Sequence, residues 1–263
     1  MEKNNFVFDL DDTVAVAISY AAEEKIKKYN EFLGEEFVNN HMIEILNYPH
    51  MIFPGFYEIF NWIINRGDNL LFFSTGTKER NEKLVEFLIE KSIDEKVEEV
   101  LKNIKIFSRK DCIKISRLPI EEQNEFIPKI IEHGEKRKVY GQKKKKLEGT
   151  VVSKDELEDT ILFDDDISYM VLGEEENFIK VNSSISYLNH RHTFTKDDYE
   201  SFHKAYYIMG LMYRAVKMKE EKNISLVKAS NKLKNLDDNF EIGFKILKER
   251  NSKFKKYFDY DTR

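Results

Sequence analysis

Short apolar runs that end on polar or acidic residues are the clearest pattern along this chain. Residues 6–8 form one such run, residues 69–73 a second and residues 160–163 a third. A continuous apolar run of this length is typical of a strand that is buried on both faces of a sheet. Weaker runs at residues 104–107 and 177–181 predict two further strands, which makes five in all.

Segments with helical spacing separate these strands. The apolar positions of residues 56–64 recur every three or four residues and predict a helix that packs on the sheet and ends at Gly67. Strands that alternate with helices are typical of an α/β fold with a parallel sheet. We therefore predict a Rossmann-like three-layer sandwich around a mainly parallel five-stranded sheet.

Two stretches fall between the predicted core elements. Residues 14–47 have a mainly helical spacing, which predicts one helix from Ala15 to just before Gly34 and a shorter one over residues 37–46. These helices either form a small helical cap, as an insertion at about residues 14–52, or simply pack on the sheet. A second excursion at about residues 108–142 includes a helix-like pattern at residues 120–133. It either lines a substrate entrance or is surface elaboration.

The C-terminal part of the chain is helical in pattern. Residues 197–217 predict an amphipathic helix, and charged residues with spaced apolar ones predict more helix over residues 219–263. The apolar stripe of the first helix consists of Phe202, Ala205, Tyr206, Met209 and Tyr213. The predicted organisation is an α/β core at residues 1–190, followed by a helical extension at residues 191–263 that packs on or beside the core.

Chemically active side chains stand where three of the apolar runs end. They are Asp9, Asp11 and Asp12 after the first run, Ser74, Thr75 and Gly76 after the second, and Asp164, Asp165 and Asp166 after the third. Because parallel strands present their carboxyl ends at one edge of an open sheet, we expect these groups to share a site. On an extended chain Asp9 and Asp11 would point the same way.

Unpaired carboxylates near a core are costly, and a divalent cation relieves that cost. The alternative is a solvated acidic turn. Asp164 directly follows its strand and is the expected direct metal ligand, whereas Asp165 acts as a second ligand or through a bound water. Asp166 is expected to be a turn or cap residue.

A phosphoryl group also needs hydrogen-bond donors and positive charge. The Ser74 hydroxyl and the backbone N–H groups of the Gly76 turn are suitable donors, with Thr75 or Thr77 as alternatives to Ser74. Lys78 and Arg80 open the next helix and are expected to be exposed helix residues, with steering of the substrate as the alternative.

The positive charge is expected from the lysine run at residues 143–146. Lys145 fits best and Lys146 next, because the apolar Leu147 begins the segment that follows. Paired acids, a hydroxyl and a lysine together form an inventory for phosphoryl transfer.

Composition excludes several classes of protein. The 263 residues are 41% hydrophobic with only four prolines, which indicates a folded protein, and the net charge of −5 argues against general nucleic-acid binding. The single Cys112 excludes an internal disulfide and a cysteine-rich zinc site. No run approaches the roughly 18 apolar residues of a membrane span. The first strand starts too early for a signal peptide, so a cytoplasmic protein is expected, with non-classical secretion left open.

In their order along the chain, these motifs resemble those of the haloacid-dehalogenase-like (HAD) phosphohydrolase superfamily. The first HAD motif, Asp-x-Asp-x-Thr/Val, matches residues 9–13, and the second, a Ser or Thr after an apolar strand, matches Ser74. The third is a lysine, and the fourth is an acidic pair that matches Asp164 and Asp165. The resemblance covers roughly residues 5–182.

The resemblance implies a Mg²⁺-dependent phosphatase that hydrolyses a phosphate monoester through an aspartyl-phosphate. Asp9 would be the nucleophile and Asp11 the general acid and base, a residue that dehalogenases of the superfamily lack. Mg²⁺ would be bound by Asp9, the backbone carbonyl of Asp11, Asp164 and Asp165. The implied substrate-binding residues are Ser74, Thr75, Gly76, Lys145 and Lys146.

Two other functions stay open at this point. A phosphotransferase or mutase would pass the phosphoryl group from the same aspartate to a hydroxyl, and a catalytically idle HAD-fold module would only bind a partner. The substrate is expected to be a phosphorylated small molecule or a phosphoprotein.

Overall fold

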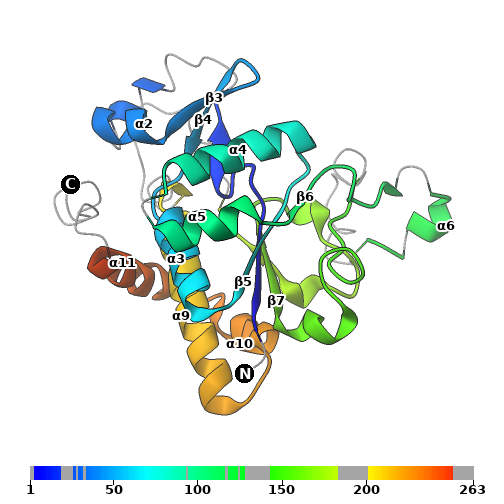
Figure 1. The fold of residues 1–263 in the computed structure, drawn as a ribbon. Coiled ribbons are helices and arrows are strands. Elements are labelled where there is room, and N and C mark those ends of the chain that lie inside the picture. Colours follow the sequence, from blue (N-terminus) through cyan, green and yellow to red (C-terminus); the bar gives the residue numbers. More distant parts are fainter. Residues whose placement is uncertain are drawn as a thin grey trace.

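A sheet of five parallel strands, in the order β6-β5-β1-β7-β8, forms the centre of the computed structural model (Figure 1). The structure describes residues 3–18, 26–27, 29–31, 34–92, 94–115, 118–123, 125–127, 143–182 and 201–250. The strands are β1 Asn5–Phe8, β5 Asn69–Phe73, β6 Ile106–Phe107, β7 Thr160–Asp164 and β8 Phe178–Lys180. The predicted α/β fold with a parallel five-stranded sheet is therefore confirmed.

Strand β1 lies in the middle of this sheet and is buried on both faces. Phe6 and Phe8 belong to a large apolar core, whereas Val7 belongs to a smaller one. The Phe8 ring stacks on Phe163 of β7 at 5.2 Å and meets Phe60 edge-on at 5.8 Å between ring centroids. Because side chains alternate along a strand, a short apolar run supplies both cores.

Helices cover the large core. They are α3 Phe56–Arg66, α4 Lys78–Glu90, α5 Glu95–Lys102, α9 Lys204–Lys222, α10 Leu226–Leu233 and α11 Asn239–Arg250. The predicted helix over residues 56–64 is confirmed, and Gly67 ends it with a left-handed φ of 78°. No helix among the described residues is long and apolar enough to cross a membrane.

Irregular segments and short 3₁₀ helices cover the small core. Its apolar side chains include Cys112, Leu147, Val152 and Met170, and no α-helix in the described part of the chain contributes to it. The short helices are η2 Lys154–Asp159, η3 Ile167–Tyr169 and η4 Glu175–Asn177. Of the helix predicted over residues 120–133, α6 Ile120–Gln123 is present, and residues 128–142 lie outside the described residues.

The insertion between β1 and α3 contains an antiparallel sheet in addition to helix. Its elements are β2 Ala15–Ala17, α2 Glu35–His41, β3 Met42–Ile45 and β4 Tyr48–Ile52, and the strand order is β2-β4-β3. Figure 1 shows this insertion beyond the edge at which the strands of the large sheet end. It is therefore placed to cover the carboxyl ends of β1 and β7.

The helices predicted for this insertion are partly wrong. Residues 14–18 are five consecutive apolar residues with β-branched members, and this segment pairs as β2 instead of starting a helix. The second helix ends at His41. Leu46 and Asn47 then have φ values of 52° and 66°, as in a two-residue hairpin turn, and join β3 to β4. Residues 26–27 and 29–31 are helical, and residues 19–25 lie outside the described residues.

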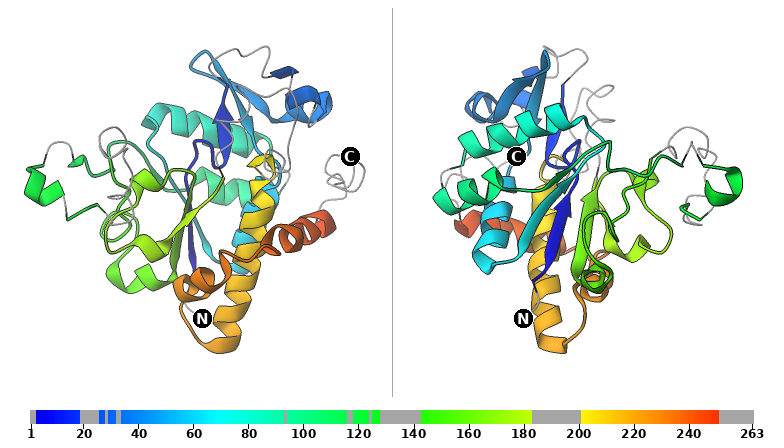
Figure 2. Two further views of the ribbon diagram at one scale, coloured as in Figure 1. Left: turned by 180° about the vertical axis from the view of Figure 1, so that it is seen from behind. Right: turned by 45° about the vertical axis from the view of Figure 1, so that its right-hand side comes forward.

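The C-terminal helices pack into the large core (Figure 2). Helices α9 and α11 approach so closely that a Cβ atom on Gly210 would lie 1.9 Å from the Asn239 carbonyl oxygen. Helix α9 is therefore buried on more than the single predicted stripe. Four of the five predicted stripe residues are buried, but Tyr213 is 41% exposed. The predicted residues 197–200 and 251–263 lie outside the described residues.

Candidate functional site

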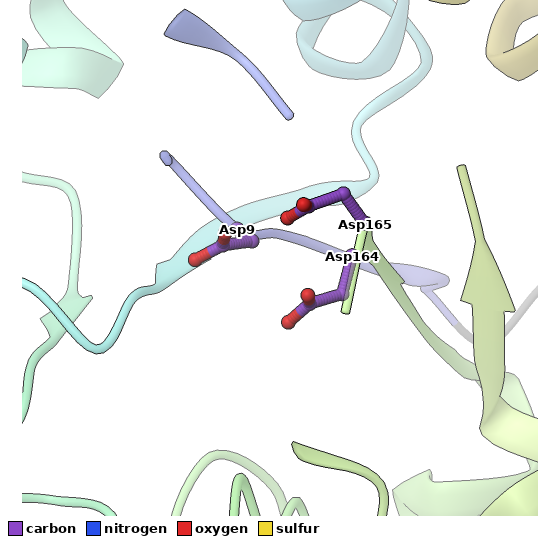
Figure 3. Close-up of side chains that lie close together, drawn as sticks. All are labelled: Asp9, Asp164 and Asp165. Carbon is purple, nitrogen blue, oxygen red and sulfur yellow. The ribbon is translucent and has the colours of Figure 1, made fainter. Parts of the chain in front are cut away.

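Three carboxylates meet at the carboxyl ends of β1 and β7. Asp9 directly follows β1, Asp164 is the last residue of β7, and Asp165 comes next. One oxygen from each carboxylate lies within 4.8 Å of the others (Figure 3). The chain runs from β1 to β5 and β6 on one side and returns to β7 on the other. The cluster therefore lies where the strand order reverses, which is the usual ligand site of open α/β sheets.

Lys145 is the lysine of the predicted run that reaches these carboxylates. Its Nζ donates to Asp9 Oδ1 at 2.7 Å and to Asp164 Oδ2 at 2.5 Å. All three side chains are buried. Lys146 is half-buried, and Lys144 donates instead to a backbone carbonyl outside the cluster. Lys145 therefore links the carboxyl end of β1 to that of β7.

Burial controls the protonation of this cluster. Burial raises the pKa of Asp9 and of Asp164, and the charge of Lys145 opposes that shift. The pKa of Asp165 rises to about 8 through burial and the neighbouring charges of Asp12 and Asp164. For Lys145, burial acts against the charged form, but the two carboxylates outweigh it and raise the pKa. An added cation would relieve the remaining negative charge.

The donor set fits a hard divalent cation. Mg²⁺ binds oxygen ligands at about 2.1 Å, so oxygens on opposite sides of one ion are about 4.2 Å apart, close to the spacing observed here. Carboxylates without histidine or cysteine are typical of Mg²⁺ or Ca²⁺ and unlike structural zinc sites. Within the described part of the chain, no other group of three potential metal ligands comes together in this way.

Asp11 lies apart from this cluster and pairs with Arg80 of α4. Arg80 Nη1 donates to Asp11 Oδ2 at 2.7 Å, and Nη2 pairs with Oδ1. The chain turns at Leu10 and Asp12 has a left-handed φ of 54°, so residues 9–12 are not the extended segment that would align Asp9 with Asp11. The Asp11 side chain is consequently not part of the three-carboxylate group.

The predicted hydroxyl-and-glycine turn is linked to Asp11. The Ser74 hydroxyl donates to Asp11 Oδ2 at 3.2 Å and accepts a hydrogen bond from Gly76 N–H at 3.0 Å. Thr75 Oγ1 lies 3.4 Å from the Tyr169 hydroxyl. The Gly76 N–H thus donates to the Ser74 hydroxyl, which in turn donates to the carboxylate of Asp11.

Arg80 and His50 are site residues that the sequence did not reveal. Arg80 was expected to be exposed, but its side chain is only 14% exposed because Asp11 and His50 surround it. The His50 Nδ1–H donates to the Tyr48 carbonyl at 2.9 Å, so Nε2 accepts from Arg80 Nε–H at 3.2 Å. Asp11 is therefore connected through Arg80 to β4 of the insertion.

Lys204 of α9 is a third residue that was missed. It is buried, and its Nζ donates to the Asp12 backbone carbonyl oxygen. The sequence did contain a signal for its burial. Lys204 directly precedes residues 205–212, which are apolar on every side of the helix, and a helix of that kind is buried all round. Asp166 behaves as predicted, because its side chain caps η3 by accepting from Ser168 N–H at 2.8 Å.

Comparisons with known proteins assign no family. No model of a protein family matches the chain, and no curated protein matches it. The fold and the geometry of the site are therefore the basis for its function. They establish a parallel α/β sheet with a buried acidic cluster at its carboxyl edge that could hold a metal ion.

Proposed function

We propose that this protein is a Mg²⁺-dependent phosphatase that hydrolyses a phosphate monoester through an aspartyl-phosphate on Asp9. The observation that carries this proposal is the convergence of Asp9, Asp164 and Asp165 with Lys145 at one edge of the sheet. Phosphoryl transfer is catalysed mainly by positioning and by neutralising charge. A nucleophilic carboxylate beside a buried lysine and a cation-binding acid pair suits both requirements.

The residues divide the reaction into two steps. A carboxylate oxygen of Asp9 bonds to phosphorus while the bond from phosphorus to the leaving oxygen breaks, and protonated Asp11 gives its proton to that oxygen. Asp11 then takes a proton from a water molecule, the water oxygen bonds to phosphorus, and the bond to Asp9 breaks. Lys145 and Ser74 bind the phosphoryl oxygens. Mg²⁺, held by Asp9, Asp164 and Asp165, supplies charge neutralisation when bound.

The Asp11–Arg80 pair has a consequence for this chemistry. Both oxygens of Asp11 accept hydrogen bonds from Arg80, so Asp11 has to separate from Arg80 before it can protonate a leaving group. His50 ties Arg80 to the insertion. Entry of a phosphorylated small molecule or a phosphoprotein beneath the insertion would disturb this link and release Asp11.

The test is hydrolysis of p-nitrophenyl phosphate, with Mg²⁺ and with EDTA, by wild type, Asp9→Asn and Asp155→Asn. Asp155 is exposed on η2, away from the site, and serves as the matched control. We expect Mg²⁺-dependent release of inorganic phosphate that falls by more than about 10³-fold in Asp9→Asn and is unchanged in the control. Retained activity in Asp9→Asn would refute the assignment.

Two further outcomes separate the alternatives. Turnover to p-nitrophenol only when an acceptor alcohol is added, with the phosphoryl group recovered on that alcohol and not as inorganic phosphate, would identify a phosphotransferase. If the folded, Mg²⁺-loaded wild type releases no phosphate, binding of beryllofluoride at Asp9 becomes the deciding measurement. Failure to bind it would favour a catalytically idle binding module.

A further inference from the structure

A second buried lysine lies beside the acidic cluster, and it comes from the C-terminal helix α9. Lys204 is 1% exposed, and its Nζ lies 3.6 Å from Asp12 Oδ1 while donating to the Asp12 carbonyl oxygen. The same Nζ lies 4.3 Å from the centre of the Phe53 ring. Asp12 is itself only 2% exposed. Both charges of this pair are therefore held out of water.

The pair acts on the acidic cluster as well as on itself. The charge of Asp12 raises the pKa of Asp165, and the charge of Lys204 opposes that rise. Asp12 reaches this position because the turn after β1 gives it a left-handed φ of 54°, and its backbone N–H donates to the Ala15 carbonyl at 2.7 Å. Asp12 follows Asp9 by three residues across this turn, so the Asp12–Lys204 pair adjoins the three-carboxylate cluster.

A charge count follows from these contacts. The four carboxylates Asp9, Asp12, Asp164 and Asp165 carry four negative charges when ionised, and Lys145 and Lys204 carry two positive ones, which leaves a net charge of −2. We infer that Lys204 sets the charge of this site so that it is matched to one divalent cation. The inference rests on the divalent-cation site of the proposed function, and it makes the C-terminal helix part of that site.

The test is calorimetric titration of Mn²⁺, as a probe for Mg²⁺, into four metal-free proteins. With the four carboxylates ionised, as a bound cation requires, the net charge is −2 in wild type, −3 in Lys204→Met, −1 in Asp12→Asn and −2 again in the double variant. If charge sets affinity, Lys204→Met should bind Mn²⁺ about tenfold more tightly and Asp12→Asn about tenfold more weakly. The double variant should lie within about threefold of wild type, because its lost charges cancel.

A purely structural role for Lys204 gives a different pattern. If Lys204 only held the turn in place, Lys204→Met and the double variant would both bind Mn²⁺ more weakly than wild type, and that result would overturn the inference. Equal affinities across the four proteins, or no binding to wild type, would overturn it as well. Lys204→Arg keeps the charge and should match wild type.

Two other effects have to be told apart from the effect of charge on Mn²⁺ affinity: loss of folding in a variant, and failure of the phosphatase proposal. Lys204→Met leaves Asp12 buried without its cation, so thermal unfolding of each variant is recorded first. If that variant does not fold, the comparison of Asp12→Asn with the double variant decides, because the inference requires about a tenfold difference between them. An Mn²⁺ series that follows net charge, together with retained phosphatase activity in Asp9→Asn or failure to bind beryllofluoride at Asp9, would refute the phosphatase proposal and leave the role of Lys204 standing.

Discussion

Two ion-pair groups at the same edge of the sheet differ mainly in their contact with water. In the inner group, Lys145 joins Asp9 and Asp164, and all three side chains are between 0% and 3% exposed. In the outer group, Arg80 forms an ion pair with Asp11, and these side chains are 14% and 37% exposed, respectively. In both groups one cation contacts two carboxylate oxygens, so the hydrogen-bond pattern alone does not tell the groups apart.

Solvent access makes the two groups behave differently. Removing one member of a buried ion pair leaves a charge that water cannot stabilise, whereas the partner in an exposed pair is readily solvated. The inner group is therefore suited to hold two strand ends in a fixed position. The outer group is suited to open and close, as the proposed proton donation by Asp11 requires.

The largest expected effect is on the inner group. Replacing Lys145 with Met should lower the free energy of unfolding by about 3–5 kcal/mol, because Asp9 and Asp164 lose their shared buried cation. Urea denaturation without metal measures this change, and Mg²⁺ should restore part of it. The control is Lys146→Met, at a half-buried neighbour, with an expected change within about 0.5 kcal/mol. Equal losses in the two variants would show that Lys145 does not stabilise the fold as the shared buried cation of the inner group.

An intermediate effect is expected from pH at the outer group. Burial lowers the pKa of His50 below its usual value, so the folded protein resists a proton that the unfolded chain accepts below about pH 6.5. The stability contributed by neutral His50 is therefore complete above that pH and is lost as pH falls, by at most about 1.4 kcal/mol per pH unit.

His50→Gln isolates this contribution. Relative to the variant, wild type should lose stability between pH 7 and pH 5, as measured by urea denaturation across that range. A difference between the two proteins that stays constant with pH would show that burial does not lower the pKa of His50.

The smallest expected effect is on the outer ion pair itself. Replacing Arg80 with Gln should lower the free energy of unfolding by no more than about 1 kcal/mol, because water reaches Asp11. Lys78→Gln, which breaks an exposed pair with Glu82 in the same helix, is the control and should change stability by less than about 0.5 kcal/mol. If Arg80→Gln lowered the free energy of unfolding by more than about 3 kcal/mol, the outer ion pair would contribute as much stability as the inner group, and solvent access would not explain the difference between them.

Local sequence determined the sheet and the place of the acids. The apolar runs before Asp9, Ser74 and Asp164 were short and uninterrupted, and each forms the strand that was predicted. Because parallel strands align their carboxyl ends, the residue that follows a strand is placed by the strand itself. That is why Asp9, Asp164 and Asp165 could be grouped from their positions in the chain.

The sequence brought Lys145 to the site, but only the tertiary structure showed that it joins Asp9 to Asp164 and that Arg80 and Lys204 pair with Asp11 and Asp12. Lys145 lies 136 positions from Asp9, Arg80 lies 69 from Asp11, and Lys204 lies 192 from Asp12. A lysine or arginine is equally compatible with solvent and with a buried carboxylate until packing removes the water around it. The same holds for residues 15–17, whose spacing suits a helix or a strand, and pairing with β4 decided for strand. Sequence thus placed the acids and Lys145, and long-range packing supplied Arg80 and Lys204.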